Sequence, residues 1–147
     1  MPKVMKSMNN VSRAQATYRQ IMSKGTPCEE LQPCQHTFVL AICRAPGRSQ
    51  EEIAADLCLN KSTVARAVAS LEGRGYVRRE ENPTDKRESL IYPTDKMLTT
   101  LPAVRTVARE WNKLISDGVS DEELEVFESV LHRMEKNAKA CVEGKVK

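Results

Sequence analysis

The chain has 147 residues and a net charge of +3; 29% of its residues are charged and only 4% aromatic, so it is long enough for one domain with an aliphatic core. No apolar run approaches the ~20 residues of a membrane span, and the basic N-terminus lacks the apolar stretch of a signal peptide, so we expect a cytoplasmic protein and no membrane partner. The five cysteines are odd in number and irregularly spaced, which argues against a disulfide framework.

Two helices are predicted before residue 45. Apolar residues at roughly helical spacing indicate a helix over about 7–24, and Gly25-Thr26-Pro27 ends it. Leu31-Gln32-Pro33 opens a second helix, whose apolar run over 38–43 we expect to be buried nearly all round. Ala45-Pro46-Gly47 then breaks the chain.

A capping box predicts where the third helix begins. In Ser49-Gln50-Glu51-Glu52 the serine hydroxyl can accept from a free amide while Glu52 reaches back. A turn at Leu59-Asn60 separates this short helix from a fourth over 61–72, and Gly75 fits a left-handed position after it. Two helices joined by a turn of this length have the spacing of a helix-turn-helix.

The second half of the chain adds a hairpin and two more helices. The period changes toward 2 over 76–80 and 89–92, which predicts two strands joined by a turn. A long apolar stripe ending near Gly118 predicts a fifth helix that starts or kinks at Pro102. A second capping box at Ser120 launches the last helix, and its large apolar residues are expected to point inward. The predicted fold is mainly α with a small β-hairpin, in the order ααααββαα.

Charge is unevenly distributed along this order. Residues 61–87 hold seven basic and four acidic side chains, whereas residues 117–135 hold seven acidic side chains and one basic. The middle of the chain could therefore meet a polyanion that the other segment would repel, which favours a nucleic-acid partner.

The helix over 61–73 has the two faces that a groove-reading helix needs. Large aliphatic residues fall on one side, and small, hydroxylated and cationic residues fall opposite. Arg66 could contact a guanine through two hydrogen bonds, and Ser62 and Thr63 could bind phosphates or bases. The alternative for this helix alone is an ordinary amphipathic surface helix.

The tip of the hairpin carries a second group of positively charged side chains that could contact DNA. Arg87 lies at its tip with Lys86 beside it, so the guanidinium could enter a minor groove. Asp85, two residues earlier, would brace Arg87, because a carboxylate facing phosphate is repelled. An Asp-x-Arg turn alone is more often a solvated surface pair, and it is the combination with the preceding helices that is specific.

Residues 62–79 resemble the recognition helix and first wing strand of the MarR (multiple antibiotic resistance regulator) family, and Pro83-Thr84-Asp85-Lys86-Arg87 resembles its wing motif. Thr94-Asp95-Lys96 resembles the start of its long dimer helix, and the likeness covers almost the whole chain. It implies a single winged helix-turn-helix domain over 1–147, with dimerisation helices in 1–30 and 97–147 and a DNA-binding lobe over 31–96.

The resemblance implies a transcription regulator of double-stranded DNA, in general a repressor released by a small-molecule or redox effector. Large apolar residues on the terminal helices independently favour a homodimer, and a dimer predicts a pseudo-palindromic operator. We expect major-groove contacts from Ser49, Gln50, Asn60, Lys61, Ser62, Thr63, Arg66 and Ser70. We expect wing contacts from Arg79, Thr84, Asp85, Lys86 and Arg87. Ala65 departs from the Ser or Thr of many relatives, so one phosphate contact is in doubt.

Sensing and rival functions are less well marked in the sequence. Cys28, Cys34 and His36 could form a thiol or metal sensor, although their spacing is not a standard zinc pattern and incidental thiols are favoured. We expect no cofactor and no catalysis: an enzyme with Cys34 as nucleophile and His36 or His132 as base would need an orienting group and an oxyanion site, neither of which is evident. A protein-protein adaptor that does not bind DNA is the other rival.

Overall fold

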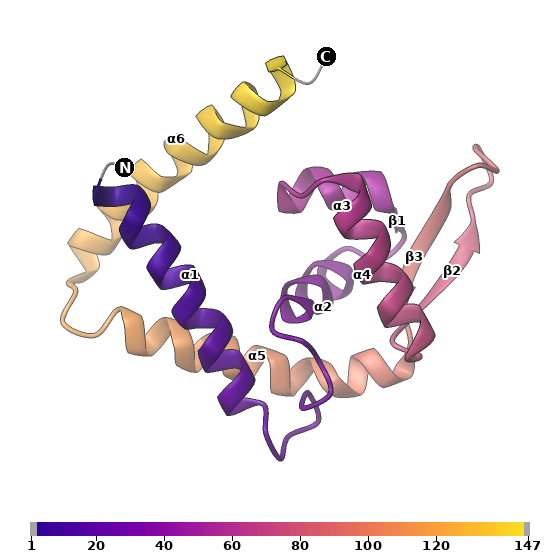
Figure 1. Cartoon of the computed structure of the whole chain (residues 1–147), viewed down its shortest axis with the longest axis horizontal. Helices are drawn as coiled ribbons and strands as arrows, with labels where there is room; N and C mark the ends of the chain where they lie inside the picture. The colour runs from indigo at the N-terminus through magenta and orange to yellow at the C-terminus, as the bar shows by residue number, and fades with distance from the viewer. Residues whose placement is uncertain (1–2, 146–147) are drawn as a thin grey trace. The chain divides into compact units, whose positions relative to one another are not determined.

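The computed structural model describes residues 3–145, which form six helices and three short strands (Figure 1). The helices are α1 (Lys3–Met22), α2 (Gln35–Arg44), α3 (Gln50–Leu57), α4 (Lys61–Gly73), α5 (Asp95–Ile115) and α6 (Asp121–Lys145), and the strands are β1 (Arg48–Ser49), β2 (Val77–Glu81) and β3 (Ser89–Pro93). The predicted class and the six helices are confirmed, with β1 as an unpredicted addition. Within the described residues, no helix is both long and apolar enough to cross a membrane.

Helix α2 begins later than the sequence pattern predicts. The segment between Met22 and Gln35 is a series of tight turns, in which successive backbone amides bond to carbonyls three residues earlier, as in Leu31 N to Cys28 O at 3.1 Å. The last of these turns joins Gln35 N to Gln32 O at 2.9 Å. The chain therefore reaches α2 through a folded loop, and that loop packs part of its length into the core.

The helix-turn-helix consists of α3 and α4, and local capping explains both starts. Both bonds of the predicted capping box are present: Ser49 Oγ accepts from Glu52 N at 3.2 Å, and Glu52 Oε1 accepts from Ser49 N at 3.3 Å. Asn60 caps α4 with one backbone bond only, its side chain accepting from Thr63 N. After α4, Gly75 has φ +83°, the left-handed conformation predicted for it.

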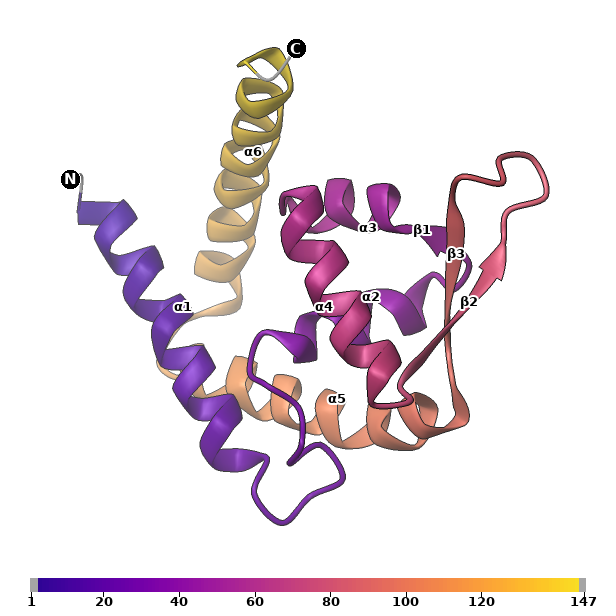
Figure 2. The same cartoon turned by 45° about the vertical axis from the view of Figure 1, so that its right-hand side comes forward.

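The three strands form one antiparallel sheet in the order β1-β3-β2, with β3 in the centre. Strand β1 is only two residues long, Arg48 pairing with Ile91 and Ser49 with Leu90. Gly47 makes this approach possible, because its φ is +86° and a Cβ there would lie 2.8 Å from the Tyr92 hydroxyl. The β2–β3 hairpin extends beyond α3 and α4 in both views (Figure 1, Figure 2).

The core lies where α2, α3, α4, the sheet and the first part of α5 meet. The apolar face of α4 supplies its centre, and residues from the other elements close around it. The largest fully buried side chains include Ile42, Ile53, Val64, Val68, Leu71, Tyr76, Ile91, Met97 and Val104. This core fixes the orientation of α4, so the opposite face of that helix is left for solvent.

Helix α5 runs through Pro102 and begins seven residues before it, so of the two predicted alternatives, a start or a kink at Pro102, the start is wrong. Proline removes one backbone donor, but Pro102 is exposed, so the unpaired carbonyl of Leu98 can bind water. The chain forms two compact units, one ending at Trp111 and the other beginning at Asn112. In the second, Ser120 caps α6 as predicted, with Oγ accepting from Glu123 N at 3.1 Å.

Candidate nucleic-acid interface

The two faces of α4 are divided as its sequence predicts. Val64, Val68 and Leu71 are completely buried, whereas Ser62 and Arg66 are exposed. Helical rotation places the exposed pair opposite the buried three. The candidate reading face is therefore turned away from the core, with no large aliphatic residue to hold it off a partner.

Asn60 organises the first turn of this face. Its Oδ1 accepts from Thr63 N and from the Ser62 hydroxyl, both at 2.8 Å. The Ser62 proton is thus already donated, and its oxygen is left as an acceptor for a base amino group. To donate to a phosphate, Ser62 would first have to release Asn60.

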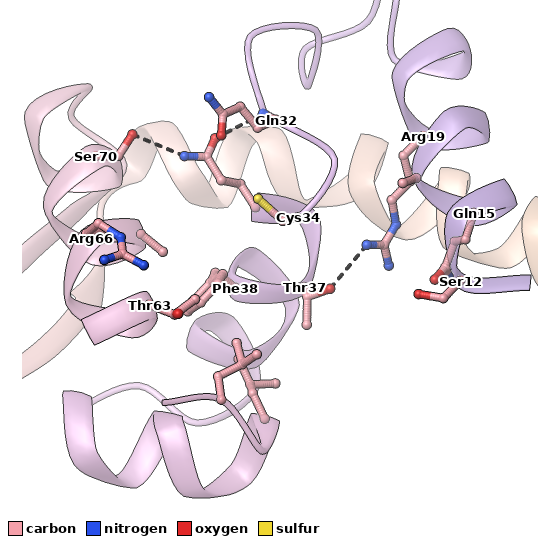
Figure 3. A pocket seen from close by; sticks show the side chains of 15 residues that line it. Ser12, Gln15, Arg19, Gln32, Cys34, Thr37, Phe38, Thr63, Arg66 and Ser70 are labelled. Atoms are coloured by element: carbon pink, nitrogen blue, oxygen red, sulfur yellow. Dashed lines mark hydrogen bonds between the residues drawn. The ribbon is translucent and has the colours of Figure 1, made fainter. Parts of the chain in front are cut away.

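Arg66 is a cation on the exposed face of α4. Its side chain is exposed and enters none of the hydrogen bonds or ion pairs found among residues 3–145. Its guanidinium borders a hollow of about 540 Å³ between α1, α2 and α4, to which the half-buried Thr63 also contributes. In Figure 3, Arg66 and Thr63 lie across this hollow from Arg19 of α1.

The start of α3 contributes less than predicted. Ser49 is buried, with 1% of its surface exposed, and its hydroxyl is engaged in the capping box. It is therefore not presented to solvent, and we give it a structural role. Gln50 is half-buried beside Arg79; with its amide turned so that the oxygen faces the guanidinium, it accepts from the two Arg79 Nη atoms at 2.7 and 3.2 Å.

A smaller hollow of about 270 Å³ lies where the starts of α3 and α4 face the hairpin. It gathers three cationic and two acidic side chains. The residues around it are Gln50, Glu51, Lys61, Arg79, Arg87, Glu88 and Ser89. Lys61 pairs with Glu51 at 3.1 Å, but both side chains are largely exposed, so this pair is weak and Lys61 remains available to a phosphate.

The wing carries the predicted brace. Asp85 Oδ1 accepts from Arg87 N at 3.0 Å and from Arg87 Nε at 3.3 Å, while the Arg87 side chain is 92% exposed. Asn82 Oδ1 shapes the same turn by accepting from Thr84 N and Thr84 Oγ1 at 3.0 and 2.9 Å. Lys86 is exposed at the tip. The hairpin therefore presents an oriented guanidinium to solvent.

Arg79 is held at the base of the hairpin. Its Nε lies 3.1 Å from each carboxylate oxygen of Glu72, at the end of α4. This contact ties β2 to the reading helix, and sequence reasoning missed it because Glu72 and Arg79 belong to different elements. Arg79 is therefore more constrained than Arg87.

Ser70 faces another unpredicted partner. Its hydroxyl oxygen accepts from Nε2 of Gln35, a side chain only 2% exposed at the start of α2. The bond is drawn in Figure 3. In the sequence, Gln35 is a polar residue beside an apolar helical run, which could have indicated a buried polar side chain. The sequence could not show which groups Gln35 contacts.

The three possible sensor residues are not equivalent. Cys28 is fully buried, and both it and His36 Nε2 contact Ser23 Oγ, at 3.5 and 3.2 Å. Burial, with a smaller contribution from the charge of Arg19, lowers the pKa of His36 to about 4. Cys34 is exposed and precedes α2. Within residues 3–145, no group of three or more His, Cys, Asp or Glu side chains is arranged to hold a metal ion.

Together these elements define a winged helix-turn-helix protein, and known proteins agree. Residues 30–88 match the MarR family. The transcriptional regulator HosA of Escherichia coli O111:H- is 30% identical over 100 residues, which cover 68% of this chain and 74% of HosA. The chain belongs to the MarR family of transcription regulators.

Solved structures share the fold over nearly the full length. The transcriptional regulator SlyA is 28% identical, with a TM-score of 0.90 over 99% of both chains. A putative MarR family transcriptional regulator from Listeria monocytogenes, complexed with 26mer DNA, is 22% identical with a TM-score of 0.86 over 95% of this chain and 91% of that one. At that identity the second likeness concerns the fold alone.

Proposed function

We propose that this chain is a cytoplasmic, sequence-specific regulator that binds double-stranded DNA as a homodimer. Residues 31–96 form the DNA-binding lobe, and the helices in 1–30 and 97–147 form the dimer interface. Membership of a family of transcription regulators supports this, as does the DNA bound to the similar Listeria protein. The observation that carries the proposal is that two separate elements each present an exposed arginine. Arg66 lies on α4, and Arg87 lies on the wing, where Asp85 holds it.

The proposed contacts fall into two groups. In the major groove, Arg66 reads a guanine, with Ser62 and Thr63 beside it. Asn60, Gln50 and Lys61 lie nearer the phosphates, while Ser49, which is buried, and Ser70, which is exposed but accepts from Gln35, have structural roles. In the minor groove Arg87 is the reader, flanked by Lys86 and Thr84, while Asp85 orients Arg87 and Arg79 anchors the hairpin.

The homodimer accounts for apolar surface that one chain leaves exposed. On α1, Val4, Met5, Met8 and Val11 are 38–57% exposed, and on α6 Val126 and Phe127 are 65% and 57% exposed. A second copy would cover such surface. Two reading helices about one DNA turn (~34–36 Å) apart would then bind a pseudo-palindromic operator.

We further propose that the protein is a repressor released by an effector that binds the larger hollow (Figure 3). Arg19 and Arg66 both line it, which favours a small anionic molecule. An effector held by Arg66 would compete with DNA for the same guanidinium. Cys34 lines the same hollow, so a thiol-modifying oxidant would act at this place too.

Selection of bound duplexes from a random pool tests the proposal, since no operator needs to be assumed. We expect enrichment of duplexes with two inverted half-sites whose centres are ~10 bp apart, and loss of that enrichment with Arg66→Ala. If no sequence is enriched and binding is weak and insensitive to salt, the chain is an adaptor instead.

A further inference from the structure

Gln35 joins the start of α2 to the end of the reading helix. Its side chain is buried, with 2% exposed, and both ends of its amide are used. Nε2 donates to Ser70 Oγ at 3.2 Å, while Oε1 accepts from Gln32 N at 3.0 Å and from Arg74 Nη1 at 3.4 Å. One buried group thus holds α4, the residue after α4 and the loop before α2.

Arg74 extends this junction to two further segments. Its Nη1 also donates to the carbonyl of Glu30, and its own carbonyl accepts from Lys96 Nζ at 2.7 Å. The Lys96 ammonium lies 4.4 Å from the centre of the Tyr76 ring, which keeps it over the junction. The C-terminal end of α4 is therefore fixed by the loop on one side and by α5 on the other.

The position of Ser70 makes this junction relevant to reading. Ser70 follows Arg66 by four residues, so the two side chains lie on the same face one turn apart. Core packing of Val64, Val68 and Leu71 holds the buried face of α4, and the bond from Gln35 to the Ser70 hydroxyl adds a second restraint on rotation of the helix about its axis. A rotation of ~20° would displace an atom ~6 Å from that axis by ~2 Å, which is enough to break a two-bond contact to a base.

We propose that Gln35 is a positioning residue for sequence reading. Through Ser70 and Arg74 it restrains the rotation of α4 more tightly than core packing alone does, and so aims Arg66 at a base edge. Ser70 acts through Gln35, not as a DNA contact. This inference rests on the proposed DNA-binding function. It adds Gln35 to that function as a residue that does not touch DNA.

Binding by four variants to the selected operator and to a scrambled duplex tests the inference. Gln35→Met removes the amide at nearly constant volume, and we expect a three- to tenfold loss of operator affinity, the effect of about one hydrogen bond. Affinity for the scrambled duplex and the salt slope should not change, because the phosphate contacts remain. Gln32→Met is the matched control. Residue 32 bonds to Gln35 only through its backbone amide, so this variant should bind the operator as tightly as the wild type does.

Ser70→Ala and the double variant separate positioning from contact. If Ser70 acts through Gln35, Ser70→Ala should reproduce part of the loss and add nothing in the Gln35→Met background. The inference is overturned if the losses of operator affinity in the two single variants add up in the double variant. It is also overturned if Ser70→Ala lowers operator affinity while Gln35→Met does not, because Ser70 would then contact DNA itself. Thermal melting confirms that each variant is folded.

Hydrogen exchange of the free protein gives a result that is independent of DNA. In Gln35→Met, amides of residues 61–74 should exchange about three- to tenfold faster than in the wild type, while those of α6 should not change. Unchanged exchange in α4 would contradict the inference even if DNA binding is confirmed. Conversely, a wild type that does not distinguish operator from scrambled DNA would refute the proposed function while leaving the junction itself testable.

Discussion

At the scale of single residues, the Asp85–Arg87 pair of the wing is a weak interaction to which we assign an orienting role. The Asp85–Arg87 pair is solvent-exposed on the arginine side, so it adds little to the stability of the fold. Its value lies in holding a guanidinium away from the hairpin in one direction. The two residues should therefore differ in what their loss does to DNA binding.

Arg87→Ala should weaken operator binding by ~1–3 kcal/mol, because it removes a base contact. Asp85→Ala should cause a smaller loss, since the guanidinium remains but is less well oriented. Both should melt within about 1 °C of the wild type, because exposed pairs contribute little to stability. Equilibrium titrations of the operator measure this, and an Asp85→Ala effect larger than that of Arg87→Ala would contradict the assigned roles.

His36 makes stability depend on pH. Its pKa is about 4 in the folded chain, lower than the ~6.5 of an exposed histidine, because burial and the charge of Arg19 both disfavour its cation. The unfolded chain binds the proton more readily between these values, so the contribution is complete above pH 6.5 and is lost as the pH falls toward 4. Over that range it amounts to roughly 3 kcal/mol.

Urea unfolding at pH 7 and pH 5 measures this effect. The loss of stability on acidification should be much smaller in His36→Gln than in the wild type. His132→Gln is the control for replacing a histidine by glutamine, because that side chain is largely exposed on α6. An unchanged pH dependence in His36→Gln would show that another group is responsible.

Sequence reasoning predicted the exposure of Ser62 and Arg66 better than it predicted the contacts of the residues around them. The exposed positions of Ser62 and Arg66 followed from helical rotation, because α4 has a clear apolar side. Ser49 and Ser70 also carry hydroxyls, yet those oxygens are engaged by Glu52 N and Gln35 Nε2. A sequence shows which groups can bind DNA but not which are already occupied by the fold.

At the scale of elements, Asp56 joins three segments around the helix-turn-helix. Its Oδ2 accepts from Arg44 at the end of α2 at 2.6 Å and from Arg48 in β1 at 3.0 Å. The Arg48 guanidinium also donates to the carbonyls of Ala41 and Ala45. Hydrogen bonds from Arg48, with the charges of both arginines, hold the pKa of Asp56 below its usual value.

Asp56→Asn should destabilise the fold by about 1–2 kcal/mol, because it weakens charge-assisted bonds to a largely buried Arg48. Glu80→Gln, which removes the half-exposed partner of Arg78, is the control and should cost less than about 0.5 kcal/mol. Chemical unfolding at pH 7 measures both. Equal effects in the two variants would mean that Asp56 is only a surface partner.

Local signals predicted most of the elements. The capping residues Ser49 and Ser120, and the left-handed Gly75, act on neighbours within a few positions, so the sequence contains their whole mechanism. Strand β1 was missed because two residues have no pattern of their own and form a strand only against β3. The late start of α2 depends on the loop packed before it.

At the scale of the whole molecule, the proposed homodimer would cover apolar surface on the terminal helices. The sequence predicts that five residues of α6 point inward: Leu124, Phe127, Val130, Leu131 and Met134. Leu124 and Leu131 are half-buried, but Phe127, Val130 and Met134 are 38–57% exposed in one chain. Hydrophobic periodicity identifies a face to be buried without saying whether the same chain or a partner buries it. That question could not be settled from the pattern alone.

Phe127→Glu should therefore weaken the homodimer, because it places a charge on the face proposed to be covered. Sedimentation should show a shift from twice 16.5 kDa toward 16.5 kDa at micromolar concentration. Glu125→Gln on the same helix, which introduces no charge, should remain dimeric. A wild type that is monomeric at all concentrations would contradict the dimer.

The central claim is that α4 reads sequence through Arg66, and its most direct test compares two duplexes and two proteins. The affinities of wild type and Arg66→Ala are measured for the selected operator and for a scrambled duplex at one salt concentration. We predict that the wild type prefers its operator at least ~10³-fold, and that Arg66→Ala loses ~1–3 kcal/mol on the operator but much less on the scrambled duplex. Equal losses on both duplexes, or no preference in the wild type, would contradict the claim.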